Sequence, residues 1–261
     1  MTDLLAHRVS VITGGARGIG LLVAERYAEE GAAVVLADID LDAADREAQR
    51  LCRAGARALA APVDVTSAES VEALADKAEA AFGPVDVVVA NAGVLLQAPA
   101  LDTTPEAWRR DLEVNLTGGF LTCTAFGRRM VDRGSGGRVV VSSSLFGLRG
   151  GRDNAAYSAS KFGLIGLAQC LAAEWAPAGV LVNAVCPGQV DTTMMRQLFH
   201  ERAALRGVAP EAVEAEMLAK IPLGRLADPR EIADLYVFLA CDLSRYVTGQ
   251  ALVADGGWLV G

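Results

Sequence analysis

A tyrosine and a lysine in the segment YSASK have a spacing that suits proton transfer. Tyr157 and Lys161 are four residues apart, so on a helix both side chains would lie on one face. A phenol has an ordinary pKa of about 10, but an ammonium about 4 Å away is worth roughly 4 kcal/mol at an effective dielectric constant near 20, or up to about 3 pKa units. Ser144, thirteen residues before the tyrosine, could donate a hydrogen bond to a carbonyl oxygen. Together the three residues predict general acid–base chemistry on a substrate oxygen.

A glycine-rich segment, TGGARGIG, occupies residues 13–20, between the first predicted strand and the first predicted helix. Gly14, Gly18 and Gly20 would let the backbone turn sharply and let a pyrophosphate approach the positive end of the helix. The segment is not a Walker A loop, since two leucines follow Gly20 where that motif needs lysine and serine or threonine. A tight connection without a ligand is the alternative interpretation, but the position between strand and helix favours a dinucleotide site.

Asp38 supports the dinucleotide interpretation. It ends the second predicted strand, 18 residues after Gly20, where a carboxylate can accept hydrogen bonds from both hydroxyls of an adenosine ribose. The alternative is a solvated aspartate at a strand end. Ile39 and Asp40 come next and no basic residue follows at once, so the local field is negative. We therefore expect NAD rather than its 2′-phosphorylated form, which would bring like charges together.

These residues need a fold that brings the ends of strands together. Short apolar, β-branched runs alternate with amphipathic stretches, and the runs are continuously hydrophobic, as in parallel strands buried on both faces. The alternation predicts an α/β fold, a single Rossmann-type doubly wound parallel sheet of about seven strands with helices on both faces. The predicted strands are Val9–Thr13, Val34–Ala37, Ala58–Val63, Val85–Ala90, Arg138–Ser142, Leu181–Val185 and Ala251–Val253. The predicted helices cover residues 18–30, 42–53, 67–82, 105–131, 155–176 and 229–240.

We expect residues 1–261 to form a single dinucleotide-binding and catalytic domain. Residues 189–222 are too long for a simple connection and rich in Met, Phe, Leu and Glu, which predicts a lid that binds substrate. The chain reaches its first predicted strand almost at once, leaving no room for a signal peptide. A cytoplasmic location is therefore expected.

Composition and motif counts exclude several other classes of protein. The formal charge of −8 would repel a phosphate backbone on average, so we expect no nucleic-acid partner. No run of about 18 apolar residues occurs, so no membrane partner is expected either. The two histidines, His7 and His200, do not form HExxH, and no GxSxG occurs, which argues against a zinc site, any other metal or a serine hydrolase. The five cysteines are scattered, as is typical of buried thiols in a reducing compartment.

With these motifs in place, the chain resembles the short-chain dehydrogenase/reductase superfamily in its one-domain branch, over nearly its whole length. The cofactor fingerprint of that family corresponds to Thr13–Gly20, and its NAG element to residues 91–93, although Ala90 stands where asparagine is more usual. The resemblance implies a catalytic tetrad of Asn115, Ser144, Tyr157 and Lys161, in which the asparagine would hold a water linked to the lysine. The cofactor-binding residues that the motifs and the resemblance imply are Gly14, Arg17, Gly18, Ile19, Gly20, Asp38, Ile39, Asp64, Val65, Asn91, Ala92, Gly93, Tyr157, Lys161, Pro187, Gly188, Val190 and Thr192.

Arg17 complicates the choice of cofactor. In NADP-dependent relatives a basic residue at this place can pair with the 2′-phosphate, whereas here it could also swing into solvent or pair with Asp38. We expect repulsion by Asp38 to decide the choice, so that NAD is preferred over NADP by at least about tenfold in kcat/KM, or about 1.4 kcal/mol.

The residues expected around the substrate are mostly apolar with a few polar points, which suits a medium-sized secondary alcohol or ketone. The Met, Leu and Phe residues after residue 189 have an alternative interpretation, in which they form the buried side of a lid helix and do not line the substrate pocket. The expected substrate residues are Ser144, Tyr157, Gln97, Phe146, Asn154, Met194 and Met195.

The favoured function is that of an NAD-dependent oxidoreductase, which interconverts a secondary alcohol and a ketone by hydride transfer with Tyr157 as general acid/base. An NADPH-dependent reductase of 3-oxoacyl groups on acyl carrier protein is the alternative among enzymes. A non-catalytic dinucleotide-binding regulator is the alternative outside them. The predicted helices 105–131 and 155–176 are apolar on more than one side, so a homo-oligomer is expected, and the habit of the family implies a tetramer.

Overall fold

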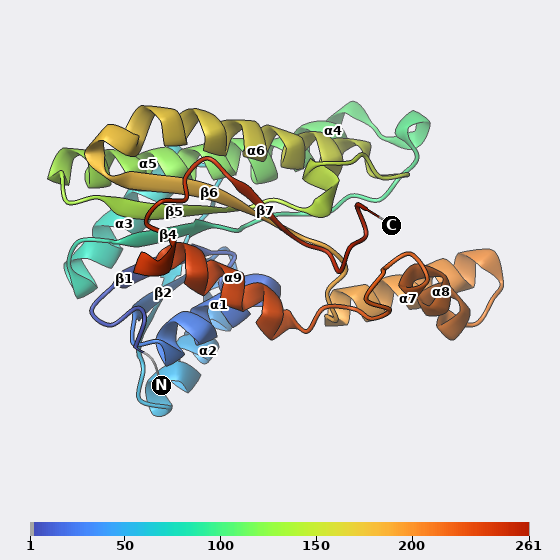
Figure 1. Ribbon diagram of the computed structural model, residues 1–261, viewed down its shortest axis with the longest axis horizontal. Helices are drawn as coiled ribbons and strands as arrows, with labels where there is room; N and C mark the ends of the chain where they lie inside the picture. Colours follow the sequence, from blue (N-terminus) through green and yellow to red (C-terminus); the bar gives the residue numbers. More distant parts are fainter. Residues whose placement is uncertain (1–2, 261) are drawn as a thin grey trace.

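A computed structural model describes residues 3–260, apart from the side chains of Thr193, Met194 and Leu205. Within this part of the chain the strands are β1 (Val9–Thr13), β2 (Ala33–Asp38), β3 (Arg57–Pro62), β4 (Val87–Ala90), β5 (Gly137–Ser142), β6 (Val180–Pro187) and β7 (Ala251–Ala254). They form one parallel sheet in the order β3-β2-β1-β4-β5-β6-β7 (Figure 1). Successive strands are added on one side of β1 up to β3 and on its other side from β4 onward, so the strand order reverses between β1 and β4. The predicted Rossmann-type, doubly wound α/β fold is confirmed.

Helices cover both faces of this sheet. Their bounds are α1 (Gly18–Glu29), α2 (Leu41–Arg53), α3 (Ala68–Phe82), α4 (Pro105–Leu112), α5 (Gly118–Arg133), α6 (Ala155–Trp175), α7 (Thr193–Arg206), α8 (Pro210–Leu218) and α9 (Pro229–Ala240). The first, second and ninth helices pack on one face, and α3, α5 and α6 pack on the other, with α4 beside α6 (Figure 1). No helix in the described part of the chain is long and apolar enough to cross a membrane.

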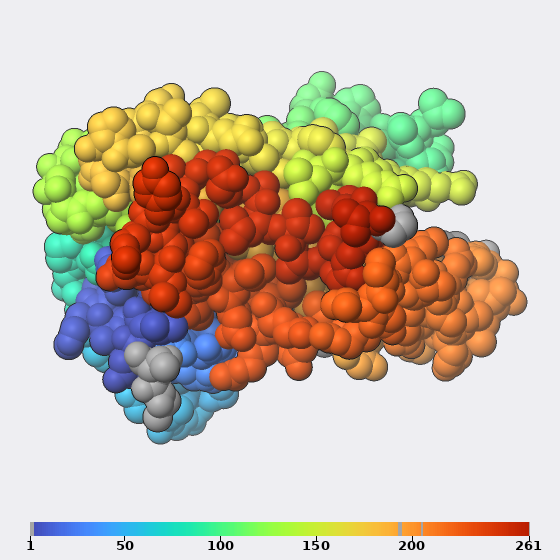
Figure 2. Space-filling view, in the orientation of Figure 1, coloured from blue at the N-terminus to red at the C-terminus, as the bar shows by residue number. Residues whose placement is uncertain are grey.

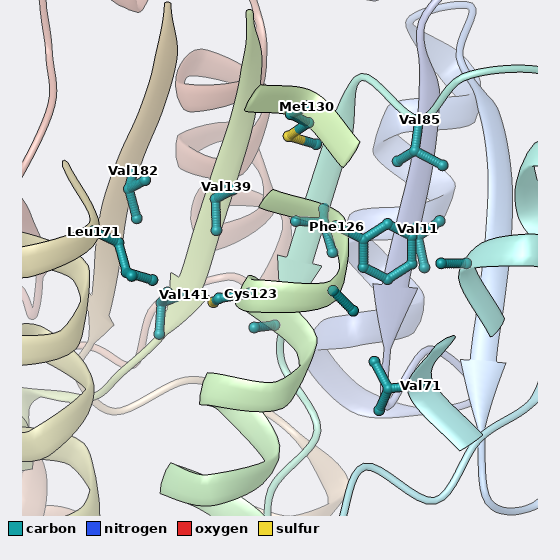
Figure 3. Packing of buried hydrophobic residues seen from close by; sticks show 14 of the residues in the cluster. Val11, Val71, Val85, Cys123, Phe126, Met130, Val139, Val141, Leu171 and Val182 are labelled. Atoms are coloured by element: carbon teal, nitrogen blue, oxygen red, sulfur yellow. The ribbon is translucent and has the colours of Figure 1, made fainter. Parts of the chain in front are cut away.

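The alternation of side chains along the buried strands divides the hydrophobic core between the two faces. Val11 and Val139 point toward α5, where they pack in one cluster with Phe126 (Figure 3). Ile12 points to the opposite face and belongs to a second cluster with Tyr236 of α9. Because each strand must fill both clusters, its sequence is apolar at successive positions. Full burial of each such side chain stabilises the fold by roughly 1.5–3 kcal/mol.

The helix predicted over residues 105–131 is present, but it is not α-helical throughout. The structure has α4, then a π-helical segment over Glu113–Thr117, then α5. Close contacts accompany this interruption, since a Cβ at Gly118 would lie 2.7 Å from Val65 and one at Gly119 would lie 2.7 Å from Leu164. Short π-helical insertions often occur at functional sites, and this one contains a predicted catalytic residue.

The long excursion after β6 contains α7 and α8, which form a small lobe beside the C-terminal segment (Figure 2). Phe199 and Met217 are buried in a separate hydrophobic cluster, against which Met195 and Trp258 pack. Part of the apolar character of this segment therefore serves the packing of its own two helices. This finding agrees with the alternative interpretation of the Met/Leu/Phe cluster.

Candidate active site

The predicted site residues follow the carboxyl ends of neighbouring parallel strands. Gly14 follows β1, Asp38 ends β2, Asn91 follows β4, Ser144 follows β5 and Pro187 ends β6. Because parallel strands all end at one edge of the sheet, these residues lie along the edge at which the strand order reverses. Doubly wound folds bind their ligands outside this edge, at the reversal.

Lys161 lies in the second turn of α6, and its ammonium is inside the protein. The residue is only 4% exposed, and Nζ donates a hydrogen bond of 2.7 Å to the carbonyl oxygen of Ser142. The ammonium also lies over the ring of Tyr157, 5.4 Å from its centroid. Burial lowers the pKa of Lys161 from its ordinary value of 10.5 to about 8. The group thus remains charged at neutral pH but loses its proton within a weakly alkaline range.

Tyr157 is partly buried at the start of α6, and the side chain of Ser144 lies close enough to influence its pKa. Burial raises the pKa of Tyr157, the nearby Ser144 side chain opposes this effect, and the negative charge of Asp111 adds to it. The pKa of Tyr157 is therefore raised, with burial as its largest cause, whereas the sequence analysis expects Lys161 to lower it. Ser144 also accepts a hydrogen bond of 3.2 Å from the backbone N–H of Phe146, which fixes its side chain.

Asn115 lies in the π-helical segment and clamps the loop after β4. Its Oδ1 accepts a hydrogen bond of 2.7 Å from Val94 N, and its Nδ2 donates to Val94 O at 2.9 Å. The same Nδ2 also donates to Ser160 Oγ at 3.1 Å, one residue before the lysine. The amide of Asn115 thereby joins the loop to α6. Its expected part in a water relay stays a prediction.

Asp111 is a buried acid near the site that the sequence analysis did not single out. It is 3% exposed, and its Oδ2 accepts a hydrogen bond of 3.2 Å from Leu96 N. Burial raises the pKa of Asp111. Asp111 and Asn115 thus hold neighbouring parts of one loop from one side. Sequence reasoning could have found Asp111 from its spacing of four residues from Asn115, because this spacing places two polar side chains on one helix face.

The glycine-rich loop is packed tightly enough to require its glycines. Gly14 has φ of +64°, and a Cβ at Gly20 would overlap the carbonyl oxygen of Gly14. Asn91 Nδ2 holds the loop by donating to Thr13 O at 3.0 Å and to Gly14 O at 3.3 Å. In the described structure Arg17 does not cap α1 with its side chain, and the first turn of that helix contains no acid. The loop therefore suits a diphosphate at the positive end of α1, which supports the fit of a dinucleotide.

Asp38 is buried at the end of β2 with both carboxylate oxygens engaged. Oδ2 accepts a hydrogen bond of 3.1 Å from Ala16 N and Oδ1 accepts one of 3.0 Å from Asp40 N. Arg17 pairs with Asp40 at 3.1 Å, not with Asp38, so that expected alternative is wrong. Both partners of this pair are exposed, as is Ile39. The geometry leaves Asp38 as the fixed negative charge at the strand end.

The other predicted cofactor residues border the same edge of the sheet. Asp64 accepts hydrogen bonds from the backbone and hydroxyl of Thr66, which lower the pKa of Asp64 and keep it charged. Gly188 N donates to Ala254 O at 2.8 Å, and Thr192 Oγ1 caps α7 by accepting from Met195 N. The remaining members are chain neighbours of residues already placed. Gly18 and Ile19 begin α1, Val65 follows Asp64, Ala92 and Gly93 follow Asn91, and Val190 lies between Gly188 and Thr192.

The expected substrate residues lie on three segments. Gln97 is exposed in the loop after β4, and the next residue forms a β-bridge with Asn154, which is buried at the start of α6. Phe146 belongs to a short 3-10 helix directly after Ser144. The structure thus brings these loops together, whereas Met195 packs within the lobe of α7 and α8. The side chain of Met194 lies outside the described residues.

Comparisons with known proteins place the chain in a family. The model of the family described as enoyl-(acyl carrier protein) reductase matches residues 14–259. The chain is 42% identical to cis-4-hydroxycyclohexanecarboxylate dehydrogenase of Sinomonas cyclohexanicum over 99% of both chains. It is 39% identical to D-threitol dehydrogenase of Mycolicibacterium smegmatis, over 98% of this chain and 94% of that protein. A solved structure from Beutenbergia cavernae with NADP bound at low occupancy is 39% identical, with a TM-score of 0.89 over 100% of both chains.

The chain belongs to the short-chain dehydrogenase/reductase superfamily. It is an NAD(P)-dependent oxidoreductase of the alcohol dehydrogenase and ketone reductase type, as the sequence predicts.

Proposed function

We propose that the chain oxidises a medium-sized secondary alcohol with NAD and reduces the corresponding ketone with NADH. The observation that carries the proposal is the buried ammonium of Lys161 over the ring of Tyr157, with the side chain of Ser144 close enough to act on the tyrosine pKa. A general acid/base and a donor to a substrate oxygen are then next to each other at the edge where the glycine-rich loop lies.

Each residue has a separate task in this reaction. When bound, the cofactor accepts or supplies a hydride. Tyr157 Oη takes the proton of the alcohol hydroxyl during oxidation and returns it to the carbonyl oxygen during reduction. Ser144 Oγ holds that same oxygen, and Lys161 stabilises the phenolate. Asn115 keeps the loop after β4 against α6 through its bonds to Val94 and Ser160.

The preference for NAD is supported by the charges around the end of β2. A 2′-phosphate would approach the buried carboxylate of Asp38, and like charges that are partly desolvated repel strongly. Arg17, which could offset this repulsion, is paired with Asp40. A relative from Beutenbergia cavernae has NADP bound, so the preference for NAD rests on these local charges and not on membership of the family.

We infer further that residues 1–261 act as one catalytic domain with residues 189–222 as a lid over the substrate, and that four such chains assemble in the cytoplasm. The free cysteines of the chain suit a reducing compartment. The apolar lobe of α7 and α8 and the loops around Phe146 and Gln97 suit an alcohol of moderate size better than a highly charged metabolite. The names of two relatives, a hydroxycyclohexanecarboxylate dehydrogenase and a threitol dehydrogenase, indicate substrates of that size.

A panel of secondary alcohols and ketones, cyclic and linear, tests this function with NAD and NADP in parallel. Formation of NADH is followed by its absorbance for each alcohol. We expect turnover of at least one medium-sized secondary alcohol, with NAD favoured at least about tenfold in kcat/KM. Equal efficiency with NADP would contradict the cofactor assignment and favour the 3-oxoacyl reductase. No turnover with any alcohol or ketone would contradict the proposed function.

A further inference from the structure

Tyr236 is a buried tyrosine whose hydroxyl reaches toward the candidate active site from the opposite face of the sheet. It lies on α9, is 0% exposed, and its hydroxyl oxygen is 2.7 Å from Ser142 Oγ at the end of β5. Packing alone would be served equally by phenylalanine, because the ring fills the same space. A buried hydroxyl costs free energy unless it is hydrogen bonded, so its partner is a specific feature of this site.

The direction of this hydrogen bond follows from the next one. Ser142 Oγ is 3.1 Å from Asn91 Oδ1, an amide oxygen that can only accept. The single proton of the serine hydroxyl is therefore donated to Asn91, so Tyr236 must donate to Ser142. Asn91 Nδ2 in turn donates to the carbonyl oxygens of Thr13 and Gly14. The hydrogen bonds all run one way, from α9 through β5 to the glycine-rich loop.

The same serine also holds the catalytic lysine through its main chain. Lys161 Nζ donates a hydrogen bond of 2.7 Å to the carbonyl oxygen of Ser142. The side chain of Ser142 is meanwhile held from two sides, by Tyr236 and by Asn91. One residue thus connects the ammonium, the glycine-rich loop and α9. Charged hydrogen bonds of this kind depend on the geometry of their acceptor.

We propose that Tyr236 is a positioning residue, which acts through Ser142 to hold the acceptor of the Lys161 ammonium and the asparagine that supports the glycine-rich loop. The consequence for catalysis rests on the proposed role of Lys161 beside Tyr157. Tyr236 contacts neither reacting group by a hydrogen bond of its own. Without its hydroxyl, Ser142 gains freedom, the ammonium loses part of its stabilisation and the lysine pKa falls.

The test compares Tyr236→Phe with Tyr27→Phe. Tyr27 is also 0% exposed, and its hydroxyl donates to the backbone carbonyl of Tyr236 at 3.0 Å, so the control loses a buried hydroxyl on the same face of the sheet without touching Ser142. Both variants should lower the midpoint of thermal unfolding to a similar extent. Only Tyr236→Phe should lower kcat for alcohol oxidation, by about threefold to tenfold, and move the acidic limb of the pH profile upward.

A second readout needs no substrate. The chain has three lysines, Lys77, Lys161 and Lys220, so NMR of protein with ¹³C at lysine Cε can follow each titration, with Lys161 assigned by Lys161→Met. The groups that face its ammonium are Tyr157 and Cys186, and neither variant changes them. We expect Tyr236→Phe to lower the pKa of Lys161 by about half a unit, and Tyr27→Phe to leave it unchanged.

Ser142→Ala completes the test, because it removes the side chain through which Tyr236 acts. The double variant Ser142→Ala/Tyr236→Phe should match Ser142→Ala alone in kcat and in the lysine pKa. If Tyr236→Phe and Tyr27→Phe give the same lysine titration, Tyr236 has only a structural role and the proposal is overturned. A normal wild-type lysine titration with no turnover of any alcohol would instead contradict the proposed function.

Discussion

Burial of Lys161 disfavours the charged ammonium, whereas the proposed function of this residue requires that charge. Its pKa falls to about 8 because the surroundings desolvate the charge, while its hydrogen bond to Ser142 and its place over Tyr157 keep it in the site. A phenol whose pKa is raised by burial needs a nearby positive charge to act as a base. In the proposed function, the protein therefore carries an unfavourable buried charge at the place where the reaction requires one.

Replacing this lysine should make the protein inactive but more stable at neutral pH. The pKa of Lys161 is lower in the folded protein than its ordinary value of 10.5, so the unfolded chain binds more protons and stability rises with pH between about 8 and 10.5. Lys161→Met should raise the free energy of unfolding at pH 7, and this advantage should shrink as the pH approaches 10.5. Urea denaturation at several pH values measures it, with Lys77→Met at an exposed lysine as the control. An advantage that does not change with pH would contradict the assignment.

The choice of cofactor should depend on two aspartates with different tasks. Asp38→Ala removes the charge that repels a 2′-phosphate and should narrow or invert the preference for NAD. Asp40→Ala leaves Asp38 in place but releases Arg17 from its ion pair, so the preference should narrow less. The ratio of kcat/KM values for NAD and NADP measures both effects. A larger change in Asp40→Ala than in Asp38→Ala would show that Arg17, not Asp38, decides the selectivity.

At the scale of elements, sequence patterns predict the strands well because each is a short apolar run bounded by turn residues. β1 has the predicted bounds, and β5 begins only one residue before them. The interruption between α4 and α5 could not be predicted in this way. It depends on contacts between distant segments, such as the clamp of Asn115 on Val94, that local periodicity does not contain.

In the candidate site, too, local sequence patterns predict some residues, while others depend on contacts between distant segments. Motif spacing predicts Ser144, Tyr157 and Lys161, because these residues are separated by fixed numbers of residues around one strand end and one helix. Tyr236 has no such motif, and for Asp111 the spacing from Asn115 indicates a shared helix face but no contact partner. Each gains its importance from a contact with a residue far away in the chain, and only the fold creates that contact.

Packing between α5 and α6 offers a test at this scale. Gly127 of α5 faces the indole of Trp175, and a Cβ at this glycine would overlap the ring. Gly127→Ala should therefore destabilise the protein by about 1–3 kcal/mol, although alanine favours helices. Equilibrium denaturation measures the loss. Adding Trp175→Leu to Gly127→Ala should recover part of it, and a fully additive pair would contradict this account of the contact.

At the scale of the whole molecule, the outer face of α4, α5 and α6 retains exposed apolar side chains. Phe120 and Phe162 are each 46% exposed, and Trp108 is also exposed. Phe126 of α5 and Leu164 of α6, which add to the apolar character of these helices, are instead buried against the sheet. The apolar surface that these helices offer to another subunit is therefore smaller than the sequence pattern indicates, and it includes Trp108, Phe120 and Phe162. The three helices lie together in one layer of the molecule (Figure 1).

We predict that this layer joins chains into a homo-oligomer, with a tetramer expected. Light scattering coupled to gel filtration should give four times the mass of one chain at micromolar concentration. Phe120→Glu, which would bury a charge in such a contact, should reduce the mass, whereas Tyr246→Glu at a fully exposed tyrosine outside this layer should not. A monomeric mass for the wild-type protein at that concentration would refute the assembly.

In the proposed reaction the chain moves a hydride from a secondary carbinol carbon, with Tyr157 accepting the hydroxyl proton. An alcohol identified in the panel is therefore prepared with deuterium on that carbon and incubated with NAD and the enzyme, and the reduced cofactor is analysed by mass spectrometry. Wild-type protein should yield one deuterium per NADH. Tyr157→Phe should yield almost no NADH while still binding NAD, because only the hydroxyl is lost. Unlabelled NADH from the wild type, or more than a few per cent of wild-type activity in Tyr157→Phe, would contradict the account.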